Sequence, residues 1–200
     1  MIALFPLIGA IAAALTLTGC ATSAPAHFYV LNPVHEGAVE FTSQTTVGVG
    51  PVVIPAYLDQ PQMVRRATAN RLDVNEFDRW GGPLQQDLTR VIAQNLSGYL
   101  RTPRVVTYPW ETAVPVDYQV TADIRRFDAA IDGDVHLEAV WAIFRDGGRR
   151  LVHMTQASIR VPVLGEDLDA VVRAQSDAVG ELSEAIAHRI SEMSGRPSAL

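Results

Sequence analysis

The chain opens with an apolar segment whose pattern differs from everything after it. Residues 2–17 are apolar or small apart from Thr16, and every Lys, Arg, Asp and Glu of the chain follows Gly19. A run of about 16 such residues is short for a helix that spans a bilayer, which needs about 20, but it is typical of the core of a secretory signal peptide. Residues 1–19 are therefore predicted to be an export signal.

Two later segments repeat apolar residues at intervals of three and four, the pattern of an amphipathic helix. The first helix is predicted from about Pro83, which suits a first turn because its missing N–H is not needed there, to Leu100. The second is predicted from about Leu168 to Met193, with Asp167 as its N-cap. The apolar stripes expected to face the core are Leu84, Leu88, Val91, Ile92, Leu96 and Tyr99 in the first helix, and Leu168, Val171, Val172, Val179, Leu182, Ile186 and Ile190 in the second.

Short runs rich in β-branched and aromatic residues surround the first helix. Strands are predicted at residues 28–31 and 45–54, and the glycines of Gly48-Val49-Gly50 within the second indicate a bulge or close backbone packing. Two short strands flanking Thr68-Ala69-Asn70 suit a hairpin. A further strand is predicted at residues 104–108, after the helix.

From Asp117 onward the period changes to two, which is typical of half-buried strands. Apolar residues alternate with polar ones at residues 118–124 and 135–143, and residues 151–163 supply a third run. Asp132-Gly133 and Asp146-Gly147-Gly148 separate these runs as hairpin turns, because glycine adopts positive φ at little cost. The pattern predicts a three-stranded antiparallel meander.

Together these elements predict an α/β (α+β) fold with six or seven strands. We expect a two-layer sandwich, in which a mixed, largely antiparallel sheet carries the two main helices on one face. The single folded domain is predicted at residues 28–194, with residues 195–200 as a C-terminal tail. Residues 20–27 are small and polar with one proline, and are expected to form a tether.

Charge and composition narrow the range of partners. The 200 residues include 16 Lys and Arg against 22 Asp and Glu, for a net charge of −6. Binding to DNA or RNA needs clustered basic residues, so a nucleic acid partner is not expected. With a single cysteine the chain forms no internal disulfide, and a domain of this size folds without one.

The residue types that carry enzyme chemistry are scattered along the chain. It has no Gly-x-Ser-x-Gly elbow, and its five histidines lack the spacing that places two metal ligands on one helix face. Asp128, Asp132 and Asp134 could suggest calcium, but the segment lacks the closing Glu of an EF-hand and already fits a turn. We therefore expect no enzymatic activity, no cofactor and no metal site.

The segment from Glu76 to Leu84 is unusual because it places Arg79-Trp80 and Gly81-Gly82 before the first helix. An arginine beside a tryptophan can stack or pair with a carboxylate, and two glycines allow a tight turn. A fold-defining corner is favoured here, with a binding site as the alternative.

The single cysteine lies at the end of the leader, in Leu17-Thr18-Gly19-Cys20. This motif resembles the lipobox of bacterial lipoproteins, which implies that Cys20 is acylated, with palmitate among the chains, and becomes the new N-terminus. Ala21 follows it, where Asp would favour retention in the inner membrane, so the resemblance implies the outer membrane. The alternative is that Cys20 is an ordinary buried thiol.

Several short motifs follow Cys20 in a defined order. They are Phe28-Tyr29-Val30-Leu31, the run from Val47 to Pro55 continuing as Ala56-Tyr57-Leu58-Asp59-Gln60-Pro61-Gln62-Met63-Val64, then Asn70-Arg71-Leu72, and Arg79-Trp80 leading to Pro83-Leu84. In this order and spacing the chain resembles the ABC-type transport auxiliary lipoproteins, the PqiC-like family, over nearly all of its mature length.

The resemblance implies a lipid-anchored periplasmic domain at the outer membrane that forms a ring-shaped homo-oligomer. It also implies docking to a tunnel-forming MCE-domain protein and, through it, to inner-membrane transport components. Such a system carries phospholipids or other hydrophobic molecules between membranes and supports envelope integrity, so no reaction is implied. The alternative is an envelope lipoprotein that regulates or scaffolds a cell-wall or other envelope complex.

Overall fold

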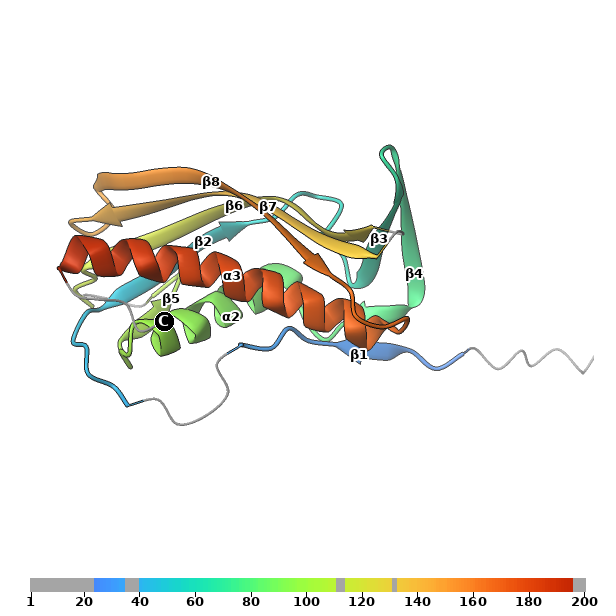
Figure 1. The fold of residues 1–200 in the computed structure, drawn as a ribbon, viewed down its shortest axis with the longest axis horizontal. Helices are drawn as coiled ribbons and strands as arrows, with labels where there is room; N and C mark the ends of the chain where they lie inside the picture. The colour runs from blue at the N-terminus through green and yellow to red at the C-terminus, as the bar shows by residue number, and fades with distance from the viewer. Residues whose placement is uncertain (1–23, 35–39, 111–113, 131–132, 196–200) are drawn as a thin grey trace, which may run out of the picture.

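The computed structural model describes residues 24–34, 40–110, 114–130 and 133–195, and it confirms the mixed α+β fold (Figure 1). Its sheet has eight strands against the total of six or seven predicted, and each of the eight corresponds to a strand segment that the sequence indicates. The elements in chain order are β1 (His27–Tyr29), β2 (Val47–Val53), β3 (Gln62–Thr68), β4 (Arg71–Trp80), α2 (Leu84–Tyr99), β5 (Val105–Thr107), β6 (Tyr118–Ala130), β7 (Asp134–Arg145), β8 (Arg150–Pro162) and α3 (Leu168–Ser194).

Strand β6 is the centre of the sheet. One of its edges pairs antiparallel with β7, which in turn pairs antiparallel with β8, so the predicted meander is confirmed. The other edge is shared by two parallel strands, β2 beside the first half of β6 and β3 beside its end. Strand β5 extends the sheet beyond β2, and β4 and β1 extend it beyond β3. The sheet is therefore mixed and branches at β6.

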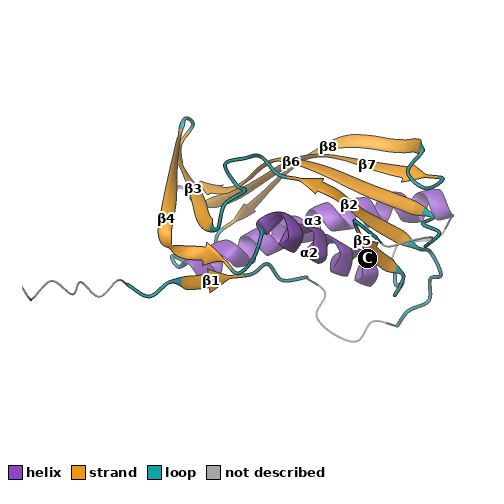
Figure 2. Ribbon diagram, turned by 180° about the vertical axis from the view of Figure 1, so that it is seen from behind, coloured by secondary structure: helices purple, strands orange, loops and turns teal. Residues whose placement is uncertain are grey.

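Both helices cover the same face of this sheet, as Figures 1 and 2 show from opposite sides. Helix α2 packs against β2 and β5, whereas α3 packs against β6, β7 and β8 and also touches α2. The predicted helical stripes are buried here except for Tyr99 and Leu168, which are partly exposed. Among the described residues no helix is long and apolar enough to cross a membrane.

The two helices begin in different ways. The Asp167 side chain accepts a hydrogen bond from the Ala170 amide at 2.7 Å, which confirms the predicted N-cap of α3. Pro83 stands at the N-cap position of α2 and not in its first turn, because the helix begins at Leu84. Both helix boundaries otherwise agree with the prediction to within one residue.

The predicted close packing at the glycines of β2 is also confirmed. The pairing of β2 with β6 shifts register between Val49 and Val52. A Cβ atom on Gly48 would lie only 2.8 Å from the ring of Trp110. Gly50 has a φ of 120° and packs against Tyr108, so only glycine fits both the conformation and the space.

An irregular segment after β1 crosses the two helices and binds to their side chains. The Leu31 amide donates to Asp87 at 2.7 Å, and the Val34 amide donates to Asn95 at 2.9 Å. Asn95 is fully buried between the helices, with Ser183 on the other side at 3.5 Å. These side chains accept hydrogen bonds from backbone amides that have no strand partner. They thereby hold β1 and the segment after it against the domain.

Candidate functional site

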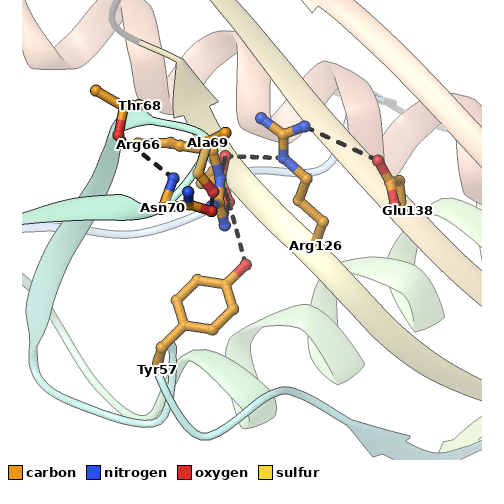
Figure 3. A network of polar contacts seen from close by, with 8 residues as sticks. Tyr57, Arg66, Thr68, Ala69, Asn70, Arg126 and Glu138 are labelled. Atoms are coloured by element: carbon orange, nitrogen blue, oxygen red, sulfur yellow. Dashed lines mark hydrogen bonds and ion pairs between the residues drawn. The ribbon is translucent and has the colours of Figure 1, made fainter.

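A buried carboxylate joins the β3–β4 hairpin to the centre of the sheet (Figure 3). Asp128 lies on β6 between the core residues Phe127 and Ala129, so strand alternation turns it to the face away from the helices. It accepts hydrogen bonds from Arg66 Nη2 at 3.0 Å, from Arg126 Nε at 3.0 Å and from the Tyr57 hydroxyl at 3.1 Å. Asp128 is fully buried, yet both of its oxygens have charged donors.

The network draws together three segments that are distant in the sequence. Arg66 reaches Asp128 from β3 through Nε as well, and its Nη1 donates to the Ala69 carbonyl in the hairpin turn at 3.2 Å. Hydrogen bonding to Asp128 raises the pKa of Arg66. Burial, and then the Asp128 charge, raises the pKa of Tyr57 above its ordinary value of 10.0. The carboxylate therefore acts as a clamp that fixes the turn end of the hairpin to β6.

The hairpin itself stands out from the main sheet, as Figure 1 shows. Strand β4 pairs with β1 only from Asp78 to Trp80, so among the described residues its free edge extends from Arg71 to Phe77. One side of the hairpin carries an open groove of about 430 Å³. We call this groove the hairpin surface; its lining is Arg65, Arg66, Ala67, Asp73, Val74, Asn75, Glu76 and Phe77.

Three features of the hairpin surface favour contact with another protein. Val74 and Phe77 are each 45% exposed, and both line the hairpin surface, so they give it an exposed apolar part. The Nε of Arg65 is buried without a hydrogen-bond partner. Unpaired strand edges are also common sites of protein association. The pattern around Asn70 predicts the hairpin, but no periodicity in the sequence indicates that it projects.

The corner at Arg79-Trp80 has the fold-defining role that the sequence favours. Trp80 is buried in the core, and its amide donates to the Pro61 carbonyl at 2.8 Å. The Nε of Arg79 donates to the Glu76 carbonyl at 3.1 Å, so the arginine binds backbone and no carboxylate there. The bond between Trp80 and Pro61 thus closes the base of the hairpin.

The three aspartates considered for calcium have separate surroundings. Asp128 is the clamp described above, and Asp134 lies 3.7 Å from Arg160 as part of an ion pair across β7 and β8. Asp132 lies outside the described residues. Across the described parts of the chain, no three His, Cys, Asp or Glu side chains gather in a way that could hold a metal ion.

Two histidines on the meander have pKa values below the ordinary value of histidine. Burial and the nearby Arg126 lower the pKa of His136, which lies in register with Asp128. Burial and then Arg189 lower the pKa of His153, whose Nδ1 accepts a hydrogen bond from Arg189 Nε at 3.2 Å. Each imidazole belongs to sheet or helix packing, and the two do not share a site.

A second cavity, of about 520 Å³, lies beside the start of α2 at the ends of β2 and β5. Several of its polar side chains already bind groups of the fold. The Gln85 amide nitrogen donates to the Val52 carbonyl at 2.6 Å, and Arg90 donates to the Leu31 carbonyl at 2.7 Å. The cavity therefore offers few free groups to a ligand.

The predicted lipidation residue, Cys20, lies outside the described residues. The first described residue after it is Ala24, and the chain then leads directly into β1. Sequence reasoning missed Tyr57, Arg66, Arg126 and Asp128 as a group. Tyr57 lies in one of the quoted motifs, which is the only signal in the sequence that points toward this network.

The fold is similar to that of solved structures of low sequence identity. A crystal structure of an uncharacterized protein matches with a TM-score of 0.70 and 19% identity, covering 84% of this chain and all of that one. A protein from Xanthomonas campestris matches with a TM-score of 0.65 and 17% identity, covering 84% of this chain and 98% of that one. At such identities the likeness shows the fold alone, and no curated protein matches the sequence. The model of the ABC-type transport auxiliary lipoprotein component family, however, matches residues 29–187, and the chain belongs to this family.

Proposed function

We propose that the protein is a non-enzymatic accessory subunit of an MCE/ABC-type intermembrane lipid transport system. The observation that carries the proposal is the family match over residues 29–187, which covers the whole folded domain except its first and last few residues. The domain would act by docking to the tunnel-forming MCE protein and so support envelope integrity. Its buried carboxylate is consistent with a structural role, since it binds Tyr57 and Arg66 and so positions the hairpin.

The domain would be held at the periplasmic face of the outer membrane by lipid on Cys20. Burial of acyl chains contributes about 0.8 kcal/mol per methylene, so two or three chains on one residue anchor a protein stably. Ala21 supports the outer membrane over the inner one. In membrane flotation the wild-type protein should move with outer-membrane vesicles, whereas Cys20→Ser should stay at the bottom of the gradient. Flotation of Cys20→Ser at the wild-type level would contradict the anchor.

A ring-shaped homo-oligomer would provide the collar for the tunnel. A ring requires two different complementary surfaces on each subunit. The open strand edges among the described residues include one along β8 and one on β4 from Arg71 to Phe77. These edges belong to different branches of the sheet, as a head-to-tail contact needs.

Crosslinking in the periplasm tests the docking proposal. A photoreactive amino acid at Phe77 on the hairpin surface should capture either a second copy of the chain or an MCE-domain protein. The matched control places the same amino acid at Phe28, which is also an exposed phenylalanine but lies outside the hairpin surface. Capture of peptidoglycan synthases alone from Phe77 would favour the cell-wall scaffold and overturn the proposal.

A further inference from the structure

The two most exposed large apolar side chains among the described residues are Leu164, at 85%, and Phe28, at 67%. Phe28 lies on β1, and Val30, which is 50% exposed, follows it two positions later. Leu164 lies in the loop that joins β8 to α3. Such exposure on ordered elements of a folded domain marks a surface that meets another apolar phase or partner.

These residues gather at one end of the molecule. Figures 1 and 2 both place β1 beside the beginning of α3, where the loop carrying Leu164 enters the helix. An open groove of about 530 Å³ is lined by Phe28 and Val30 on one side and by Asp169 and Val172 of α3 on the other. We call Phe28, Val30 and Leu164 the apolar end.

The apolar end is held rigidly by the fold. Phe28 is in register with Arg79 of β4. The next residue, Tyr29, accepts a hydrogen bond at its carbonyl from the Gly81 amide at 2.7 Å, which holds β1 in place. Because side chains alternate along a strand, Tyr29 turns toward the domain while Phe28 and Val30 turn away. On the other element, Gly165 packs against Ala170, with only 2.8 Å between its Cβ position and the alanine methyl, and so fixes the loop that carries Leu164.

The chain itself indicates what covers this end. Cys20 precedes β1 by seven residues, which span at most about 25 Å when fully extended and about 15 Å as a flexible chain. A lipid-anchored Cys20 therefore keeps β1 within reach of the membrane surface. Phe28 and Val30 are the exposed large apolar side chains nearest to that anchor in sequence among the described residues.

We propose that the apolar end rests on the phospholipid surface to which Cys20 is anchored, with Phe28, Val30 and Leu164 at the boundary between headgroups and acyl chains. This inference rests on the proposed lipidation of Cys20. Apolar side chains of interfacial proteins penetrate about 5–10 Å into this boundary. The contact would orient the domain on the membrane, which a flexible tether alone cannot do.

The charges around the apolar end determine which lipids it prefers. Glu166, Asp167, Asp169 and Asp177 surround the beginning of α3, against Arg173 on the same helix and Arg79 on β4. An acidic surrounding gives no electrostatic attraction to anionic lipids. The contact is therefore apolar in origin, and it should not require anionic headgroups.

Fluorescent probes on the lipidated full chain test the inference. Since the chain has a single cysteine, whose sulfur the lipid occupies, an introduced cysteine is the only free thiol. Phe28→Cys and Leu164→Cys carry an environment-sensitive NBD label. Leu151→Cys is the matched control, because Leu151 is 48% exposed at the beginning of β8, and Figure 1 shows this end of β8 at the opposite end of the sheet from β1. Each protein is purified from membranes and placed in vesicles of phosphatidylethanolamine and phosphatidylglycerol with nitroxide-labelled acyl chains.

The probes at residues 28 and 164 should shift to the blue and lose most of their fluorescence to the nitroxide, whereas the probe at residue 151 should keep both its spectrum and its intensity. The same result is expected when phosphatidylcholine replaces phosphatidylglycerol. If the protein floats with the vesicles but residues 28 and 164 behave as residue 151 does, the membrane contact is wrong and the anchor stands. If quenching requires phosphatidylglycerol, its apolar origin is wrong. If the protein does not float, the anchor and this inference both fail.

Discussion

Replacement of Asp128 should destabilise the domain far more than replacement of any exposed aspartate. In Asp128→Ala the guanidinium groups of Arg66 and Arg126 lose their shared acceptor, and the Tyr57 hydroxyl loses its acceptor as well. Removing one side of a buried ion pair costs about 3–5 kcal/mol. Both arginine side chains keep some contact with water, at 23% and 22% exposure, so hydration offsets part of this cost.

We therefore expect Asp128→Ala to lower the free energy of unfolding by about 3 kcal/mol, and Asp128→Asn, which keeps the shape but not the charge, by about 2 kcal/mol. For a chain of this size about 3 kcal/mol corresponds to a fall in Tm of roughly 6–12 °C. Urea unfolding of the mature chain, followed by circular dichroism, measures the change. The slope of the unfolding curve should stay constant, because the same surface is exposed on unfolding.

Asp123 provides the control on the same strand. It is an exposed aspartate whose nearest cation, Arg125, lies 3.9 Å away, so Asp123→Ala should change stability by less than about 1 kcal/mol. Tyr57→Phe should cost about 1 kcal/mol alone and little more when added to Asp128→Ala, because the two share one hydrogen bond. Equal midpoints for Asp128→Ala and Asp123→Ala would refute the clamp.

Three further predictions concern stability. The pKa values of His136 and His153 are lowered in the folded protein, so both residues take up a proton more readily in the unfolded chain. Their contribution to the free energy of unfolding is therefore fully present above about pH 6.5 and is lost as the pH falls through the lowered pKa values. Urea midpoints measured from pH 7.5 down to 5 should fall more steeply for the wild type than for His153→Gln, and equal slopes would count against this cause. Asn95→Ala should lower the unfolding free energy by about 1–3 kcal/mol, because the fully buried Asn95 side chain is lost and the partly buried Val34 amide loses its acceptor; thermal unfolding with no change in Tm would disprove this. Asp167→Ala should cost about 1 kcal/mol by removing the cap of α3, and unchanged amide exchange in the first turn of α3 would argue against it.

The local elements of the fold could be predicted from the sequence because short-range rules determine them. The stripe from Leu84 to Leu96 and the cap at Asp167 define the helices, and alternation after Asp117 defines the meander. The hairpin around Asn70 follows from its turn residues. In each case the signal and the structure it predicts lie within one stretch of chain.

The long-range pairings could not be predicted in the same way. Strand β6 pairs with β2, β3 and β7, and no periodicity in the sequence indicates which strands pair with its two edges. From the sequence alone, Asp128 resembles part of an acidic turn. Its burial depends on Arg66 and Tyr57, which lie about 60 to 70 positions earlier, so no local pattern indicates it. Val74 and Phe77 read as ordinary strand residues, because exposure depends on how far the hairpin projects from the sheet.

The central claim is that this domain works as a lipid-anchored subunit of an envelope transport complex, and affinity purification from solubilised envelopes tests it most directly. The wild-type chain, carrying a C-terminal tag, should bring down an MCE-domain protein and its ABC permease in mass spectrometry, in amounts that fall sharply for Cys20→Ser. If the wild-type chain instead recovers only cell-wall enzymes, with neither transport component above the untagged control, the account is contradicted.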